Sequence, residues 1–249
     1  MTTRLLRALP PPPHELLAGA SLFLDLDGTL VDIAARPDAV QVDQRLLDLL
    51  ARLSTMLGRR LVVVSGRPAA EVQAFLRGTG VAVVGSHGAE LEGHALQQAA
   101  PAPPDDMMRS LATFATTHPG VLIETKPFGI AIHYRLAPQA GLAAHALAQH
   151  VAALHGFALQ PGKQVIEIKY HRITKGDAVR RLMAVAPMQA GRPLFIGDDE
   201  TDEAGFAAAA ALGGDGILVG PPRATQAHFG LAGVAAALAW LEDAMGCLT

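Results

Sequence analysis

The segment SLFLDLDGTL at 21–30 runs from apolar residues into two aspartates whose spacing could support chemistry. Residues two apart on an extended strand share a face, so Asp25 and Asp27 are expected on the same side. Two carboxylates held close together repel each other, and one stays protonated unless a cation intervenes. A second acidic segment, GDDETDE at 197–203, also follows an apolar run and supplies Asp198 and Asp199. These oxygen ligands, with no nearby Cys or His pattern, predict a divalent cation and favour Mg²⁺ over zinc.

Three further residues are suited to binding a phosphate group. Ser65 and Gly66 follow the apolar run LVVV at 61–64, where a hydroxyl and a closely approaching amide can meet phosphate oxygens. Lys175 heads a predicted helix and offers a compact positive charge for a phosphoryl oxygen. With the acidic residues, this set predicts phosphoryl transfer to a carboxylate. One aspartate attacks phosphorus, and the other protonates the leaving oxygen and then activates water.

The elements that must position these residues form an alternating pattern. Short apolar runs at 22–24, 61–64, 81–84, 194–196 and 217–219 are continuous, which is typical of strands buried on both faces. Helical spacing at 42–57, 68–77 and 175–185 lies between them and predicts an α/β core with a doubly wound parallel sheet. Ligands bind at the carboxyl ends of such strands, so the polar residues should converge there.

The middle of the chain has a different texture. The segment QQAAPAPPDD at 97–106 is typical of a linker. Helices are expected at 107–117 and 140–154, and period-2 segments occur at 121–126, 129–136 and 163–170. We therefore predict an inserted α+β cap domain with an antiparallel sheet at 98–173, between core segments 1–97 and 174–249. One face of that sheet is expected to be apolar, and the other to carry charged residues of both signs, which suits sugar hydroxyls.

The segments DLDGT at 25–29, SGR at 65–67, the helix-heading lysine and GDDETDE resemble the four motifs of the haloacid dehalogenase-like (HAD) phosphatase superfamily. The resemblance implies that Asp25 is the nucleophile and that Asp27 is the general acid and base. It also implies that Ser65 and Lys175 bind the phosphoryl group. The implied metal ligands are Asp25, Asp27 through its backbone carbonyl, Asp198, and Asp199 as a ligand or a supporting partner. Asp202 and Glu203 either cap the following helix or support the site.

With SHGAE at 86–90 and KPFGIAIHYR at 126–135, the chain is similar to the trehalose-6-phosphate phosphatase family within that superfamily. This resemblance implies Mg²⁺-dependent hydrolysis of trehalose 6-phosphate to trehalose and phosphate through an aspartyl-phosphate, the last step of trehalose biosynthesis. It also implies that Glu124, Lys126 and Glu167 contact the distal glucose. Five other residues are candidates for substrate binding: Gly66, Arg67, His87, His133 and Arg135.

Composition limits the partners. The net charge of −3 gives no electrostatic reason to expect nucleic acid or an anionic membrane. No secretory signal or membrane span is expected, and the single cysteine fits a reducing, cytoplasmic setting. We expect a monomer that acts on a small sugar phosphate.

Other functions remain open at this stage. The chain could be a phosphatase of a sucrose-phosphate or mannosylglycerate-phosphate type, or a phosphomutase. A phospho-receiver also combines acidic residues, Ser or Thr, and Lys on such a sheet, but its phosphoacceptor lies on a later strand than the acidic pair. That order is reversed here.

Overall fold

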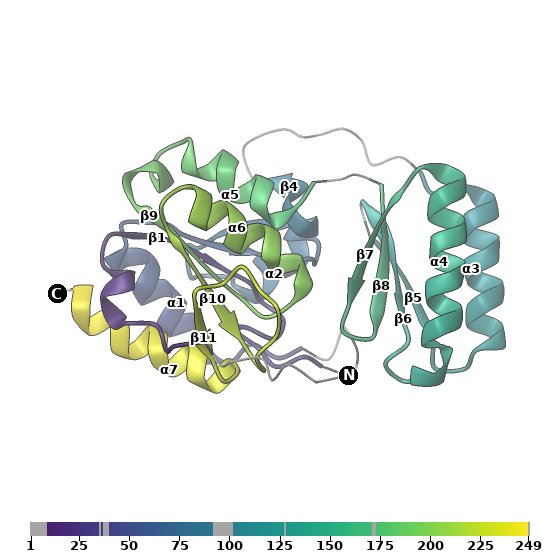
Figure 1. Cartoon of the computed structure of the whole chain (residues 1–249), viewed down its shortest axis with the longest axis horizontal. Coiled ribbons are helices and arrows are strands. Elements are labelled where there is room, and N and C mark those ends of the chain that lie inside the picture. Colours follow the sequence, from purple (N-terminus) through teal and green to yellow (C-terminus); the bar gives the residue numbers. More distant parts are fainter. Residues whose placement is uncertain are drawn as a thin grey trace, which may run out of the picture. The chain divides into compact units, whose positions relative to one another are not determined.

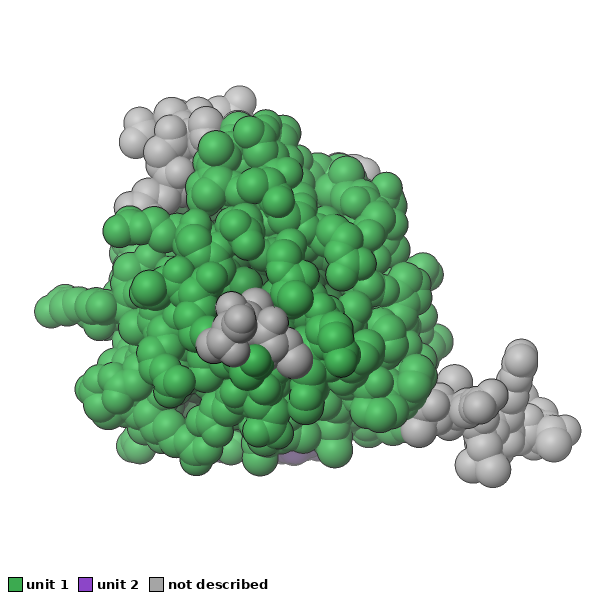
Figure 2. Space-filling model, turned by 90° about the vertical axis from the view of Figure 1, so that its left-hand side faces the viewer, with its two compact units in different colours: residues 1–92, 174–249 green, residues 93–173 purple. Residues whose placement is uncertain are grey.

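The protein forms two compact units, one of residues 1–92 and 174–249 and the other of residues 93–173. They are drawn as a cartoon in Figure 1 and coloured separately in Figure 2. The computed structural model describes residues 9–34, 36, 40–91, 102–126, 128–170 and 173–248. Part of the linker expected at 97–106, namely 97–101, lies outside the described residues. Within the described residues, no helix is long and apolar enough to cross a membrane.

The first unit contains a seven-stranded sheet in the order β11-β10-β9-β1-β2-β3-β4. Its strands are β1 (Ala20–Leu24), β2 (Leu61–Val64), β3 (Ala82–Gly85), β4 (Glu90–Leu91), β9 (Arg192–Gly197), β10 (Asp215–Val219) and β11 (Phe229–Leu231). The strands pair in parallel, except that β4 is antiparallel to β3. Its helices are α1 (Gln44–Met56), α2 (Ala69–Phe75), α5 (Lys175–Met183), α6 (Glu203–Ala211) and α7 (Val234–Ala244).

Helices cover both faces of this sheet, and this explains the continuous apolar runs (Figure 1). In β1, Leu22 and Leu24 pack in one buried cluster with residues of α1, α2 and α7. Phe23 points into a second buried cluster with residues of α5 and α6. Because successive side chains of a strand point to opposite faces, both faces need apolar residues. The doubly wound parallel sheet predicted from the sequence is confirmed.

The proline-rich N-terminal segment runs along the edge of this sheet. The backbone N–H of Gly230 in β11 donates to the carbonyl of Pro10 at 3.0 Å. The indole Nε1 of Trp240 in α7 donates to the carbonyl of Pro12 at 2.9 Å. An exposed edge strand is a template for pairing with other chains, and prolines cannot donate to a further strand. This segment therefore both covers the edge at β11 and ends the pairing there.

The second unit contains an antiparallel sheet in the order β5-β6-β8-β7 with two helices on one face (Figure 1). Its elements are α3 (Asp105–Thr117), β5 (Leu122–Lys126), β6 (Gly129–His133), α4 (Gly141–His155), β7 (Ala158–Gly162) and β8 (Val165–Lys169). The isoleucines of β6 and β8 pack in a buried cluster with residues of both helices. The predicted antiparallel sheet with one apolar face is confirmed.

Candidate active site

Polar side chains follow three adjacent strands of the core sheet at their carboxyl ends. Asp25 follows β1, Ser65 follows β2, and Asp198 follows β9, and these strands are neighbours in the order β9-β1-β2. The backbone N–H of Asp25 donates to the carbonyl of Ile196 at 2.9 Å, so the ladder between β1 and β9 continues to the first aspartate. The sequence argument from strand ends therefore predicted this edge correctly.

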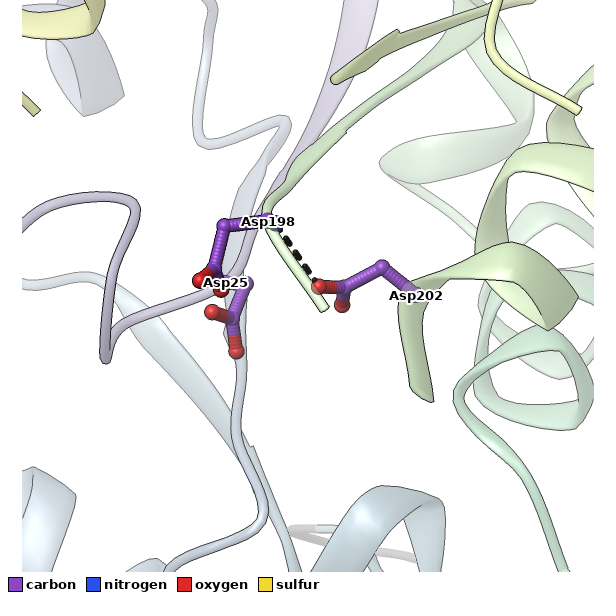
Figure 3. Close-up of side chains that lie close together, drawn as sticks. All are labelled: Asp25, Asp198 and Asp202. Carbon is purple, nitrogen blue, oxygen red and sulfur yellow. Dashed lines mark hydrogen bonds between the residues drawn. The ribbon is translucent and has the colours of Figure 1, made fainter. Parts of the chain in front are cut away.

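Three aspartates converge at this edge. Asp25, Asp198 and Asp202 each offer a carboxylate oxygen, and these oxygens lie within 4.8 Å of one another (Figure 3). All three are buried, with 4%, 4% and 0% of their surface exposed. Asp202 lies in the short helical turn η6 (Glu200–Asp202), where its Oδ2 accepts from the N–H groups of Asp198 and Asp199, each at 2.9 Å. The loop after β9 is thus folded around the carboxylate of Asp202.

Lys175 supplies positive charge to this group. It is the first residue of α5, after a capping box in which the side chains and backbone of Thr174 and Asp177 bond each other. Its Nζ lies 2.6 Å from Oδ1 of Asp25 and 2.7 Å from Oδ1 of Asp202. Burial works against the charged form of Lys175, but both carboxylates outweigh it and raise the pKa of this lysine. The ammonium is therefore held in its charged form.

Negative charge still exceeds positive charge at the site. Burial raises the pKa of Asp25 well above its ordinary value; Lys175 opposes this rise, and Asp202 and Asp198 add to it. Lys175 contacts Asp25 and Asp202 but is a single ammonium for a group of three carboxyl groups, so the described group has more acidic than basic side chains. A buried oxygen-only donor set with this excess fits a hard divalent cation. Asp25, Asp198 and Asp202 are the residues that could hold it.

The group shares Asp25 and Asp198 with the ligand set expected from the sequence. It contains Asp202 in place of the side chain of Asp199, and the ligand expected from Asp27, its backbone carbonyl, is not a side-chain group. Oδ1 of Asp199 accepts from the N–H of Glu200 at 2.6 Å and caps the turn η6. The segment GDDETDE shows that several carboxylates are present, but the local turn decides which of them point inward.

Asp27 is held by an arginine. Nε of Arg67 lies 2.7 Å from Oδ2 of Asp27, and Nη2 of Arg67 donates to Oδ1 of Asp27 at 2.9 Å. Arg67 also pairs with Glu71, one turn later on α2. Arg67 is predicted from the sequence as a candidate for substrate binding, but no spacing indicates its contact with Asp27, because the two residues are far apart in the chain.

The loop after β2 is bonded to the loop after β3. The N–H of His87 donates to the carbonyl of Ser65 at 2.9 Å, and Ser65 Oγ accepts from the N–H of Arg67 at 3.1 Å. A Cβ on Gly66 would lie 2.6 Å from Cε1 of His87, so the imidazole packs directly against a glycine backbone. Ser86 and His87 both have positive φ, at 46° and 55°. Such backbone costs free energy and persists where surrounding contacts fix it.

The predicted charged residues of the second unit share one face of its sheet. The register places Glu124, Ala131, Glu167 and Gln160 in one row across the four strands. Nε2 of His133 lies 2.7 Å from Oε2 of Glu124. Burial raises the pKa of Glu124, but the hydrogen bond from His133 and the charge of Lys126 outweigh this and lower it.

A second ion pair lies on this face. Nζ of Lys126 is 3.3 Å from Oε1 of Glu167, and Glu167 is buried. Arg135 lies beyond the end of β6, where its Nη2 donates to the carbonyl of Lys163 at 2.9 Å. The structure therefore brings Glu124, Lys126, His133 and Glu167 together, and places Arg135 on a turn.

One arginine that the sequence analysis does not name supports the acidic loop. Nη2 of Arg223 donates to the carbonyl of Asp199 at 2.8 Å, and Arg223 pairs with Glu203 at the start of α6. Glu203 Oε2 also accepts from the N–H of Gln226 at 2.7 Å. These contacts tie the loop after β10 to the loop that carries Asp198. Neither loop has a spacing in the sequence that would indicate this pairing.

The sequence is similar to known proteins over most of its length. The trehalose-phosphatase family model matches residues 23–225. Trehalose-6-phosphate phosphatase of Escherichia coli is 39% identical over 92% of this chain and 87% of its own. A probable trehalose-phosphate phosphatase of Sinorhizobium fredii is 38% identical over 89% of this chain and 88% of its own.

Solved structures share the fold. The C-terminal domain of Candida albicans trehalose-6-phosphate phosphatase superposes with a TM-score of 0.82 and 23% identity, over 96% of this chain and 98% of that one. A HAD-superfamily phosphatase of Bacteroides thetaiotaomicron superposes with a TM-score of 0.60 and 14% identity, over 100% of both chains. The HAD fold expected from the motifs is therefore confirmed. The extent of the family match, together with relatives more than a third identical over most of the chain, shows that this chain belongs to the trehalose-phosphatase family of enzymes.

Proposed function

We propose that this protein hydrolyses trehalose 6-phosphate to trehalose and phosphate with the help of Mg²⁺, through an aspartyl-phosphate on Asp25. The observation that carries the proposal is the contact of Lys175 Nζ with Asp25 and Asp202 inside a buried group of three carboxylates. Such a group attracts a divalent cation and, with it, an anionic phosphate. Family membership favours a trehalose phosphate as the substrate.

In the first step, a carboxylate oxygen of Asp25 forms a bond to phosphorus, and the bond between phosphorus and the sugar oxygen breaks. The leaving oxygen takes a proton from Asp27, and trehalose is released. In the second step, Asp27 takes a proton from water, whose oxygen attacks phosphorus and frees Asp25. Phosphate leaves, and the proton taken from water replaces on Asp27 the one that left with trehalose.

The other core residues bind and orient the phosphate. Lys175 and the hydroxyl of Ser65 contact phosphoryl oxygens, and Thr29 Oγ1, which lies 3.2 Å from Oδ2 of Asp25, orients the nucleophile. Mg²⁺ held by Asp25, Asp198 and Asp202 would neutralise charge that otherwise repels the phosphate from the carboxylate. Asp199 supports this set by capping the turn that carries Asp202.

The sugar is proposed to bind through the charged face of the second unit. Carboxylates of Glu124 and Glu167 accept hydrogen bonds from hydroxyls, and Nζ of Lys126 donates to them. His133 holds Glu124 in its ionised form through their contact. His87 is proposed to form one wall of the phosphate site, because its ring packs against Gly66.

A substrate panel tests this function. Purified protein with Mg²⁺ is given trehalose 6-phosphate, sucrose 6-phosphate, mannosylglycerate phosphate or glucose 6-phosphate, and free phosphate is measured. The highest kcat/KM is expected for trehalose 6-phosphate. A higher kcat/KM for another sugar phosphate would overturn the substrate assignment, and isomerised products without free phosphate would indicate a mutase.

A further inference from the structure

We propose that Arg67 is a positioning residue for catalysis: it fixes the orientation of the Asp27 carboxyl from which the proton is passed to the leaving sugar oxygen. This inference rests on the proposed function, in which Asp27 is the general acid and base. It replaces the interpretation of Arg67 as a group that binds the substrate.

The contact between the two side chains is bidentate. Two nitrogens of Arg67 meet both oxygens of Asp27, at 2.7 Å and 2.9 Å. A planar guanidinium matched to a planar carboxylate fixes the orientation of the carboxylate as well as its distance. The side chain of Asp27 is 31% exposed and that of Arg67 only 11% exposed. The arginine is therefore the fixed member of the pair, and the aspartate is the one that substrate can reach.

Arg67 is itself held from three sides. Its Nη1 pairs with Glu71 of α2, and its guanidinium carbon lies 5.5 Å from the centre of the Phe75 ring. The carbonyl of Arg67 accepts from the N–H of Ser86 at 2.9 Å. These contacts lock the rotamer and the backbone of Arg67, and a locked partner can transmit its orientation to Asp27.

The same contacts argue against a primary role in phosphate binding. The carboxylates of Asp27 and Glu71 already contact all three nitrogens of Arg67 and together outweigh its single positive charge. Burial acts against the charged form of Arg67, but Asp27 and Glu71 outweigh it and raise the pKa of the guanidinium. A phosphate would therefore meet a guanidinium whose charge is already offset, whereas Lys175, at the start of α5, contacts Asp25, and Ser65 follows the strand next to that of Asp25.

Leaving-group dependence separates positioning from binding. The leaving group of trehalose 6-phosphate is a sugar alkoxide, which needs a proton, whereas the phenolate of p-nitrophenyl phosphate departs without one. For either substrate, kcat/KM reports the steps up to and including departure of the first product, the sugar or the nitrophenol. In Arg67→Met, kcat/KM for trehalose 6-phosphate is expected to fall about 100-fold, the lower end of what general acid–base catalysis contributes. The value for p-nitrophenyl phosphate is expected to fall less than about 5-fold if only proton transfer is affected.

Two reference variants define the scale. Arg67→Lys keeps the positive charge but loses the bidentate contact. Its kcat/KM for trehalose 6-phosphate should therefore lie between the values of the wild type and of Arg67→Met. This variant also decides the matter should Arg67→Met fail to fold. Arg45→Met is the matched control, because Arg45 makes an equally bidentate contact with Glu242 on the exposed surface, at 3.0 Å and 2.8 Å. Its two kcat/KM values should remain those of wild type.

The outcomes separate this inference from the function on which it rests. A wild-type protein that does not hydrolyse trehalose 6-phosphate overturns the proposed function. If Asp27→Asn lowers kcat/KM equally for both substrates, the role of Asp27 as general acid is wrong. In a third outcome, Asp27→Asn lowers kcat/KM more for trehalose 6-phosphate than for p-nitrophenyl phosphate, but Arg67→Met and Arg67→Lys lower it equally for both substrates. The positioning role of Arg67 is then wrong, and the proposed function stands.

Discussion

The carboxylate of Asp198 occupies the space where a side chain on Gly28 would begin. A Cβ on Gly28 would lie 2.2 Å from Oδ2 of Asp198, and Gly28 has a φ of +90°. The turn after Asp27 therefore requires glycine at position 28 for two reasons, its backbone conformation and the close approach of the Asp198 carboxylate. This explains why a glycine follows the aspartate pair and ties the first acidic segment to the second.

Substituting Gly28→Ala should displace Asp198 and weaken metal binding. The matched control is Gly78→Ala, because Gly78 has a φ of +87° but nothing within 4 Å of its Cβ position. Both variants carry the backbone strain of about 1–3 kcal/mol. Only Gly28→Ala should also lose the rise in Tm that Mg²⁺ gives, as measured by thermal unfolding with and without EDTA. Equal Mg²⁺ responses in both variants would show that the contact with Asp198 does not matter.

Asp198→Asn should separate metal binding from folding. Removing one of three buried carboxylates relieves repulsion, so the metal-free protein is expected to gain stability. The variant should also lose most of the stabilisation by Mg²⁺, which is about 2.7 kcal/mol at a hundred times Kd. Urea unfolding in EDTA and in excess Mg²⁺ measures both effects. Asp243→Asn, on the exposed side of α7, is the control and should retain the wild-type response.

Five strands of the core sheet were predictable because each reads as a continuous apolar run, whereas the short edge strands β4 and β11 were not predicted. β7 was not predicted, because it lacks alternation and contains Pro161, which an edge strand tolerates. Asp25, Lys175 and Asp198 were predictable from the ends of strands and the start of a helix. The inward turn of Asp202 and the contacts of Arg67 and Arg223 depend on tertiary packing, which no local spacing encodes.

Asp25→Asn should abolish phosphate release and yet stabilise the metal-free protein at neutral pH. The pKa of Asp25 is raised in the folded state, so the native protein binds this proton more tightly than the unfolded chain. The free energy of unfolding therefore falls as pH rises from about 4 toward neutral. Asparagine does not titrate, so the free energy of unfolding of Asp25→Asn does not fall in this way. The difference in stability between the variant and the wild type should therefore shrink as pH returns to about 4. Urea titrations in EDTA at several pH values measure the difference, and a pH-independent difference contradicts it.

The charged face of the second unit should govern affinity for the sugar and leave the chemistry intact. Glu124→Gln and Glu167→Gln each weaken a hydrogen bond to a charged group, worth about 1.5–3 kcal/mol, or roughly 10- to 100-fold in kcat/KM for trehalose 6-phosphate. For p-nitrophenyl phosphate, kcat/KM should stay near that of wild type. Arg109→Met, on the exposed side of α3, serves as the control. Equal losses on both substrates would place these glutamates outside sugar recognition.

Trapping the covalent intermediate tests the central claim most directly. The enzyme is quenched during turnover of trehalose 6-phosphate and treated with borohydride, which reduces an aspartyl-phosphate to homoserine, and the modified residue is located by mass spectrometry. The account predicts homoserine at position 25 in the wild type and none in Asp25→Asn. Phosphate release in the wild type with no reduced residue, or with the modification at Asp27, would contradict it.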